Sequence, residues 1–172
     1  MSAAGPPVTL RLAVPADVLA VARVHVATWQ TAYRGLVPDA YLDRLQAEER
    51  ATRYDFSHVD ASKPRTIVGV ADGSVVGFAT TAPAAAGTPG GELCALHVHP
   101  GWWGRGIGVT LIEEARAHLI ATGHRTAWLW MLDGNARAER FYRQDRWEPD
   151  GARRTVDVWG VTLREVRFAR EL

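Results

Sequence analysis

The stretch LCALHVHPGWWGRGIGVTLI, residues 93–112, carries the most informative pattern in this chain. It predicts an apolar strand, then a glycine-rich turn, then the start of an amphipathic helix. Three glycines alternate at positions 104, 106 and 108, where the helix is expected to begin. A helix start offers unpaired backbone N–H groups and a positive dipole end, and glycine has no Cβ atom to hold a ligand away from them. The stretch therefore predicts a site for an anion such as a phosphate group.

Around this stretch, length and composition indicate one domain spanning residues 1–172, with 47% hydrophobic and 23% charged residues. A net charge of +1 gives no reason to expect a nucleic-acid partner. No apolar run is long enough for a membrane span, and residues 1–7 lack the pattern of a signal peptide. We therefore expect a cytoplasmic protein with flexible residues 1–7, and we expect the single cysteine, Cys94, to be a buried structural thiol.

The hydrophobic patterns predict an α/β (α+β) single-domain fold with about seven strands and about four helices. The order is strand, two helices, three strands, helix, strand, helix, two strands. The expected strands are residues 8–12, 66–71, 75–81, 92–98, 126–132, 155–159 and 163–168, and the expected helices are 17–30, 39–54, 109–122 and 135–145. A loop is expected over residues 83–91.

The glycine-rich turn differs from two other phosphate-binding loops. A dinucleotide-binding loop reads G-x-G-x-x-G, and here the third glycine comes one position too early. A P-loop needs Gly-Lys followed by Ser or Thr, which this chain does not contain. The spacing disfavours a dinucleotide oxidoreductase.

The turn resembles the acetyl-CoA-binding motif of the GNAT superfamily of N-acetyltransferases, which reads Gln/Arg-x-x-Gly-x-Gly/Ala. Gly106 and Gly108 match its last two fixed positions. Trp103 stands where the motif has Gln or Arg, and Arg105 is a candidate to supply the cationic character instead. The backbone cradle does not depend on that side chain.

A second match lies about 30 residues downstream, where residues 135–142 fit the later family motif Asn-x-x-Ala-x-x-Phe-Tyr. Two motifs in the expected order are far more specific than either alone. The resemblance implies an acyl-CoA N-acyltransferase fold, with a mixed, mostly antiparallel sheet whose strands 92–98 and 126–132 splay apart to receive acetyl-CoA. It implies cofactor contacts at Leu96, His97, Val98, Trp103, Gly104, Arg105, Gly106, Ile107, Gly108, Val109, Asn135 and Tyr142.

The implied reaction is acetyl transfer from acetyl-CoA to a primary amine of a small molecule or peptide, by direct attack and without a metal. Tyr142 is the candidate acid for the leaving thiolate, because a phenol stays protonated at neutral pH; the alternative is a packing role. Glu92 is the candidate base, with His97 and His99 as competitors. Asn135 is either a cofactor contact or a helix cap.

The predicted acceptor wall consists of Trp29, Tyr33 and Trp130. Trp29 and Tyr33 are four residues apart and share a helix face, and Trp130 shares a strand face with Trp128. The alternative is that these aromatics form core or homodimer contacts. A second class of function, a non-catalytic acyl-CoA sensor of the same fold, also fits the sequence.

Overall fold

The computed structural model describes residues 6–58, 60–84 and 87–172. Residues 1–5 of the expected flexible segment, and residues 85–86 of the expected loop, lie outside this part. The strands are β1 (Thr9–Leu12), β2 (Arg65–Ala71), β3 (Ser74–Pro83), β4 (Gly91–Val98), β5 (Thr126–Leu132), β6 (Glu148–Val158) and β7 (Val161–Glu171). The α-helices are α1 (Val18–Ala32), α2 (Asp39–Leu42), α3 (Ala47–Ala51), α4 (Ile107–Ala121) and α5 (Ala136–Gln144).

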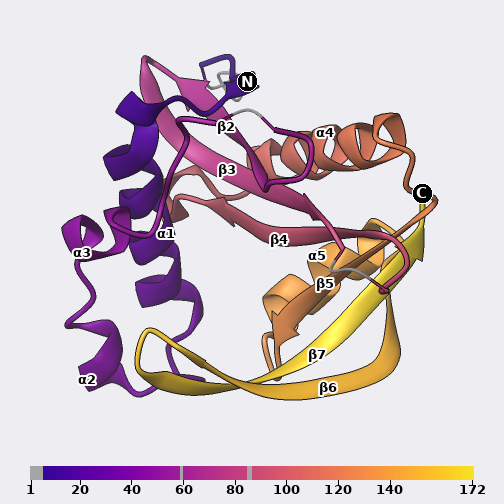
Figure 1. Cartoon of the computed structure of the whole chain (residues 1–172). Helices are drawn as coiled ribbons and strands as arrows, with labels where there is room; N and C mark the ends of the chain where they lie inside the picture. Colours follow the sequence, from indigo (N-terminus) through magenta and orange to yellow (C-terminus); the bar gives the residue numbers. More distant parts are fainter. Residues whose placement is uncertain (1–5, 59, 85–86) are drawn as a thin grey trace, which may run out of the picture.

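The strands form one sheet in the order β1-β2-β3-β4-β5-β7-β6 (Figure 1). Every neighbouring pair is antiparallel except β4 and β5, which are parallel. This parallel pair is registered only at Gly91 with Ala127 and at Glu92 with Trp128. Beyond these residues the two strands diverge, which confirms the predicted splay. We call the resulting gap between β4 and β5 the wedge.

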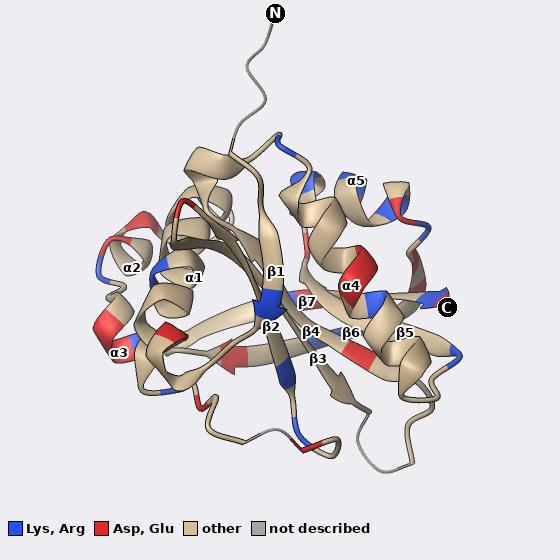
Figure 2. Ribbon diagram, turned by 90° about the horizontal axis from the view of Figure 1, so that it is seen from above, with Lys and Arg blue, Asp and Glu red and all other residues tan. Residues whose placement is uncertain are grey.

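Helices cover both faces of the sheet. Ile67 and Val68 are neighbours on β2 and face opposite ways, as strand geometry requires. Ile67 joins a core with Leu111 of α4, whereas Val68 joins one with Val21 of α1. Viewed from above, α1 lies on one side of the sheet, with α4 and α5 together on the other (Figure 2).

The prediction of one continuous helix over residues 39–54 is wrong. Two short helices, α2 and α3, form there instead, with a break between them. Gln46 has an extended backbone, with φ −122° and ψ 135°. The side-chain amide of Gln30 on α1 donates to the carbonyl oxygens of Leu42 and Leu45. A contact from α1 thus overrides the helix propensity of this segment.

The last hairpin is much longer than the sequence predicts. Strands β6 and β7 each run for 11 residues around a turn in which Trp159 and Gly160 have φ values of 55° and 80°. Positive φ at both positions is typical of a tight hairpin turn. The prediction stopped early because most side chains of β6 are polar and exposed, so an apolar pattern is missing there.

Candidate active site

The wedge exposes backbone groups of β4. The His99 N–H donates to the carbonyl oxygen of Val76 on β3 (2.8 Å). Since successive residues of a strand turn their backbone groups to opposite sides, those of Leu96 and Val98 point towards β5. β5 is not paired with β4 there. The Val98 carbonyl accepts from side chains of this protein, whereas the backbone groups of Leu96 and the N–H of Val98 can bond to an extended ligand that lies in the wedge.

A cavity of about 660 Å³ fills the wedge and continues between α1, α3, the glycine turn and α5. All but two of the residues predicted to form the site line it. The exceptions are Glu92 and Arg105, which is exposed with its guanidinium carbon 4.6 Å from the ring centroid of Trp102. The structure therefore brings the two sequence motifs and the predicted acceptor wall to one cavity.

The glycine turn has the backbone geometry that its sequence predicts. Gly104 and Gly106 have φ values of 75° and 78°, in the left-handed region that favours glycine. A Cβ atom at either position would meet nothing within 4 Å, so the space beside them is open to a ligand. At Gly108, by contrast, a Cβ atom would come within 3.2 Å of the Phe141 ring. Gly108 thus allows α4 and α5 to approach each other.

Trp103 stands where the family motif has Gln or Arg, and its side chain has a structural role. Its indole N–H donates to the carbonyl oxygen of Val98 (2.7 Å), which also accepts from the Thr28 hydroxyl (3.2 Å). The guanidinium carbon of Arg137 lies 3.7 Å from the Trp103 ring centroid. Arg137 and Arg140 of α5 both line the cavity, whereas Arg105 of the glycine turn does not.

Two residues of the second motif face the cavity from α5. The side-chain oxygen of Asn135 accepts from the Ala138 N–H (3.1 Å), so this residue caps the helix. Burial raises the pKa of Tyr142 above its usual value of 10. Within the described residues the Tyr142 hydroxyl forms no hydrogen bond, although its ring packs near Phe141 and Trp147. The hydroxyl therefore stays protonated and can donate to a ligand.

Glu92 lies at the closed end of the wedge, paired with Trp128 and half-buried. Burial raises the pKa of its carboxyl group above 4.5, opposed by Arg154. Cys94, two residues along β4, lines the cavity and is exposed, so the predicted burial of this residue is wrong. The thiol borders the wedge, where β5 has moved away. Desolvation and the charge of Glu92 raise its pKa to about 12, so it remains a protonated thiol.

The two histidines predicted as alternative bases have different surroundings. His97 lines the cavity, and burial lowers its pKa to about 4. Its ring stacks on His25 of α1, with centroids 4.4 Å apart, and His25 in turn bonds to the Tyr54 hydroxyl through Nδ1. The ring of His99 instead accepts from the Gly101 N–H (3.2 Å). Of the two histidines predicted as bases, only His97 lines the cavity.

The three residues of the predicted acceptor wall all line the cavity. The Trp29 and Tyr33 rings lie 4.9 Å apart between centroids. Trp130 lines the same cavity from β5, with the Arg154 guanidinium carbon 4.3 Å from its ring centroid. Trp128, on the same strand face, is absent from the cavity lining because it lies where β4 and β5 still pair.

Sequence reasoning missed several further residues that line this cavity, among them the polar residues His25, Arg50, Tyr54 and Glu165. They come from α1, α3, the segment after α3, and β7. The available signal was His25, a polar residue within the apolar stripe of α1. The convergence of the other three depends on tertiary packing.

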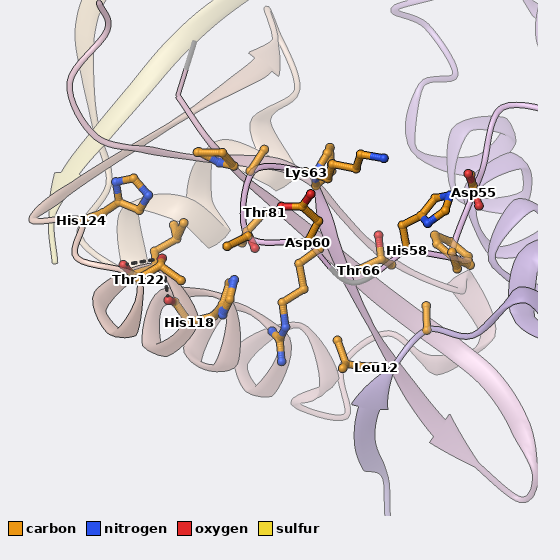
Figure 3. A pocket seen from close by; sticks show the side chains of 18 residues that line it. Leu12, Asp55, His58, Asp60, Lys63, Thr66, Thr81, His118, Thr122 and His124 are labelled. Carbon is orange, nitrogen blue, oxygen red and sulfur yellow. Dashed lines mark hydrogen bonds between the residues drawn. The ribbon is translucent and has the colours of Figure 1, made fainter. Parts of the chain in front are cut away.

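A second hollow of about 410 Å³ lies between the C-terminal half of α4 and residues 55–58 and 60–66 (Figure 3). It is lined by His58, Lys63, His118 and His124, among others, and shares no residue with the wedge. Across the described ranges, no three His, Cys, Asp or Glu side chains are grouped as metal ligands. In the same ranges no helix is long and apolar enough to cross a membrane.

A mostly antiparallel sheet whose two central strands part beside a glycine-rich helix start defines the acyl-CoA N-acyltransferase class. Residues 27–146 match the model of the Acetyltransferase (GNAT) family, and the chain belongs to this family of acyltransferases. This confirms the resemblance seen in the sequence.

Similar proteins agree with this assignment. An uncharacterized N-acetyltransferase, YuaI of Bacillus subtilis, is 29% identical over 167 residues, which are 92% of this chain and 90% of the relative. A GCN5-related N-acetyltransferase structure from Rhodopseudomonas palustris has a TM-score of 0.74 at 23% identity, covering 100% of this chain and 99% of its own. YncA from Salmonella typhimurium, solved with its cofactor acetyl-CoA, has a TM-score of 0.70 at 19% identity, covering 96% and 94%.

Proposed function

We propose that this protein transfers an acetyl group from acetyl-CoA to a primary amine of a small molecule or peptide. The observation that carries the proposal is the wedge, where the backbone groups of Leu96 and the N–H of Val98, unpaired with β5, lead to the open glycine turn. The residues present fit this co-substrate. An extended arm with two amides suits β4, and a diphosphate suits the start of α4 beside Arg137 and Arg140.

The thioester of acetyl-CoA supplies an activated acetyl group, and the residues of this chain must then manage two protons. The amine nitrogen attacks the carbonyl carbon while the carbon–sulfur bond breaks. Tyr142, which lines the cavity, is our candidate to donate its hydroxyl proton to the departing sulfur. A backbone N–H of β4 is the candidate donor to the oxyanion. Cys94 has no role as a nucleophile in this scheme, because direct attack of the amine needs no covalent intermediate on the protein.

The remaining question is which group takes the amine proton. Burial disfavours the charged form of both candidates. It therefore raises the pKa of a carboxyl group and lowers the pKa of an imidazole. The pKa of Glu92 is raised above 4.5, whereas that of His97 is lowered to about 4. Burial thus favours proton uptake by Glu92 and opposes it at His97, so we assign the role of base to Glu92. Because it does not line the cavity, we propose that it acts through an intervening water molecule.

The test of the acid role is Tyr142→Phe, which removes the hydroxyl and keeps the ring. We expect kcat to fall about 100-fold, because a general acid contributes roughly that much or more. The affinity for CoA, measured by calorimetry, is expected to stay the same. An unchanged kcat, with the chemical step shown to limit turnover, would contradict the role.

An assay of CoA release with a broad panel of amines separates an enzyme from a sensor. A sensor would bind CoA and release none above background. A cytoplasmic location and a homodimer stay predictions from the sequence, and light scattering of the purified protein tests the second of these.

A further inference from the structure

The α1–α3 end of the cavity, lined by His25, Trp29, Arg50, Tyr54 and His97, contains a cation without a counter-ion. Arg50 is half-buried, and its Nε atom is buried with no hydrogen-bond partner among the described residues. Nor does any ion pair join Arg50 to a carboxylate in that part of the chain. A charge in such a position is costly unless something compensates it.

Neighbouring side chains hold this guanidinium without neutralising it. Its carbon lies 3.7 Å from the ring centroid of Trp159 and 5.3 Å from that of Tyr54. These rings contact the guanidinium through cation–π interactions, and neither supplies an anionic carboxylate that would neutralise it. The two histidines nearby are neutral, since burial lowers the pKa of both.

The other charged side chains that line the cavity either form an ion pair or lie on α5, away from α1 and α3. Glu165 is the one carboxylate among the lining residues described, and its Oε2 lies 2.6 Å from Nε of Arg154. Arg137 and Arg140 lie on α5, where the guanidinium carbon of Arg137 is 3.7 Å from the Trp103 ring centroid. Arg50 is thus left as the cation of the α1–α3 end.

We propose that the acceptor carries a carboxylate or another small oxyanion besides its amine, and that Arg50 binds this anion. The guanidinium offers two parallel N–H donors to such a group. Three contacts in succession link Arg50 to β4: Arg50 with Trp159, Trp159 with His25 (4.9 Å) and His25 with His97 (4.4 Å). An α-amino acid or an aminoalkyl phosphonate has the required chemistry. The assignment of this end to the acceptor rests on the proposed function.

The test compares matched ligands that differ only in the anion. We titrate each ligand into the CoA-saturated protein by calorimetry. The standard L-amino acids are compared with their amides, and short aminoalkyl phosphonates with the corresponding amines. At least one acid is expected to bind about 10- to 100-fold more tightly than its uncharged counterpart. Carboxylate and phosphonate arms show which oxyanion is preferred.

Arg50→Gln is expected to abolish this preference, whereas Arg50→Lys retains part of it. Arg53→Gln is the matched control, because Arg53 follows on the same segment but is exposed and does not line the cavity. CoA affinity and the circular dichroism spectrum, which should not change, show that each variant is folded.

Equal binding of acids and their uncharged counterparts, or a preference that survives in Arg50→Gln, would overturn the inference. Acetylation of amines without regard to an anion would leave the proposed function intact and remove this inference. If the preference for an anion depends on Arg50 but no bound ligand is acetylated, the anion site stands and the proposed function is contradicted.

Discussion

At the scale of single residues, Gly104, Gly106 and Gly108 show that one motif serves two purposes. The first two adopt left-handed backbone beside open space, whereas the third admits the Phe141 ring. The family pattern contains both requirements without distinguishing them. Their separation here gives a matched experiment.

Gly106→Ala is expected to weaken CoA binding at least tenfold, because a methyl group enters the space beside the amides that would hold the phosphates. It should also lower the free energy of unfolding by about 1 kcal/mol, because φ is 78°. Gly73→Ala is the control: φ is 72° in the β2–β3 turn, and a Cβ atom there meets nothing within 4 Å. It should cost similar stability without changing CoA affinity. Equal affinity losses in both variants would contradict the phosphate role.

His97 makes stability depend on pH. Its pKa is lowered from 6.5 to about 4, so the unfolded chain takes up a proton first as the pH falls. Stability is therefore retained above pH 6.5 and lost between pH 6.5 and 4, with a contribution of about 2 kcal/mol lost by pH 5. Urea denaturation at pH 7.5 and 5 measures this loss. It should shrink in His97→Gln but not in His58→Gln, where the side chain is exposed. Identical pH dependence of wild type and His97→Gln would contradict the assignment.

At the scale of elements, one carboxylate fastens α5 to its surroundings. Asp145 follows α5 and pairs with Arg116 of α4 (3.0 Å) and Arg170 of β7 (3.1 Å). It also accepts from the Trp147 indole N–H (2.9 Å). All these groups are half-buried or buried. The position of Tyr142, three residues earlier, thus depends on an ion-pair network between elements distant in sequence.

Asp145→Ala is expected to lower the free energy of unfolding by about 3 kcal/mol, because it leaves two half-buried guanidinium groups without their partner. Asp133→Ala is the matched control. Its ion pair with Arg153 (3.1 Å) is exposed, so the expected loss is below about 1 kcal/mol. Chemical denaturation measures both values. Similar small losses in the two variants would show that the network does not fasten α5.

The elements that the sequence predicts well bury a regular apolar pattern. Helix α4 is an example, since Leu111, Ile112, Ala115 and Leu119 are all buried. The predictions failed where packing between distant segments decides the structure, as at Leu42 and Leu45, whose carbonyls are taken by Gln30. The same limit explains the site. Its cofactor side follows from two local motifs, whereas Arg50 reaches the cavity only through the placement of α3 against α1.

At the scale of the whole molecule, the wedge separates the two halves of the sheet along most of β4 and β5. The two strands pair only at one short region, Gly91–Glu92 with Ala127–Trp128. Elsewhere the halves are connected by a common core in which Leu93 and Leu129 pack together with residues of α4. A continuous core predicts one cooperative unit rather than two. A ligand that fills the wedge would add contacts to both halves.

We therefore expect a single thermal unfolding transition, which tryptophan fluorescence and far-UV circular dichroism should report at the same temperature. CoA at about 100 times its dissociation constant should stabilise the folded state by about 2.7 kcal/mol, because it binds only that state. For a chain of this size the midpoint should rise by about 5–10 °C. Gly106→Ala at the same CoA concentration should show a smaller rise. Two separate transitions would contradict the single unit, and an unchanged midpoint with CoA would show that the wedge does not bind this ligand.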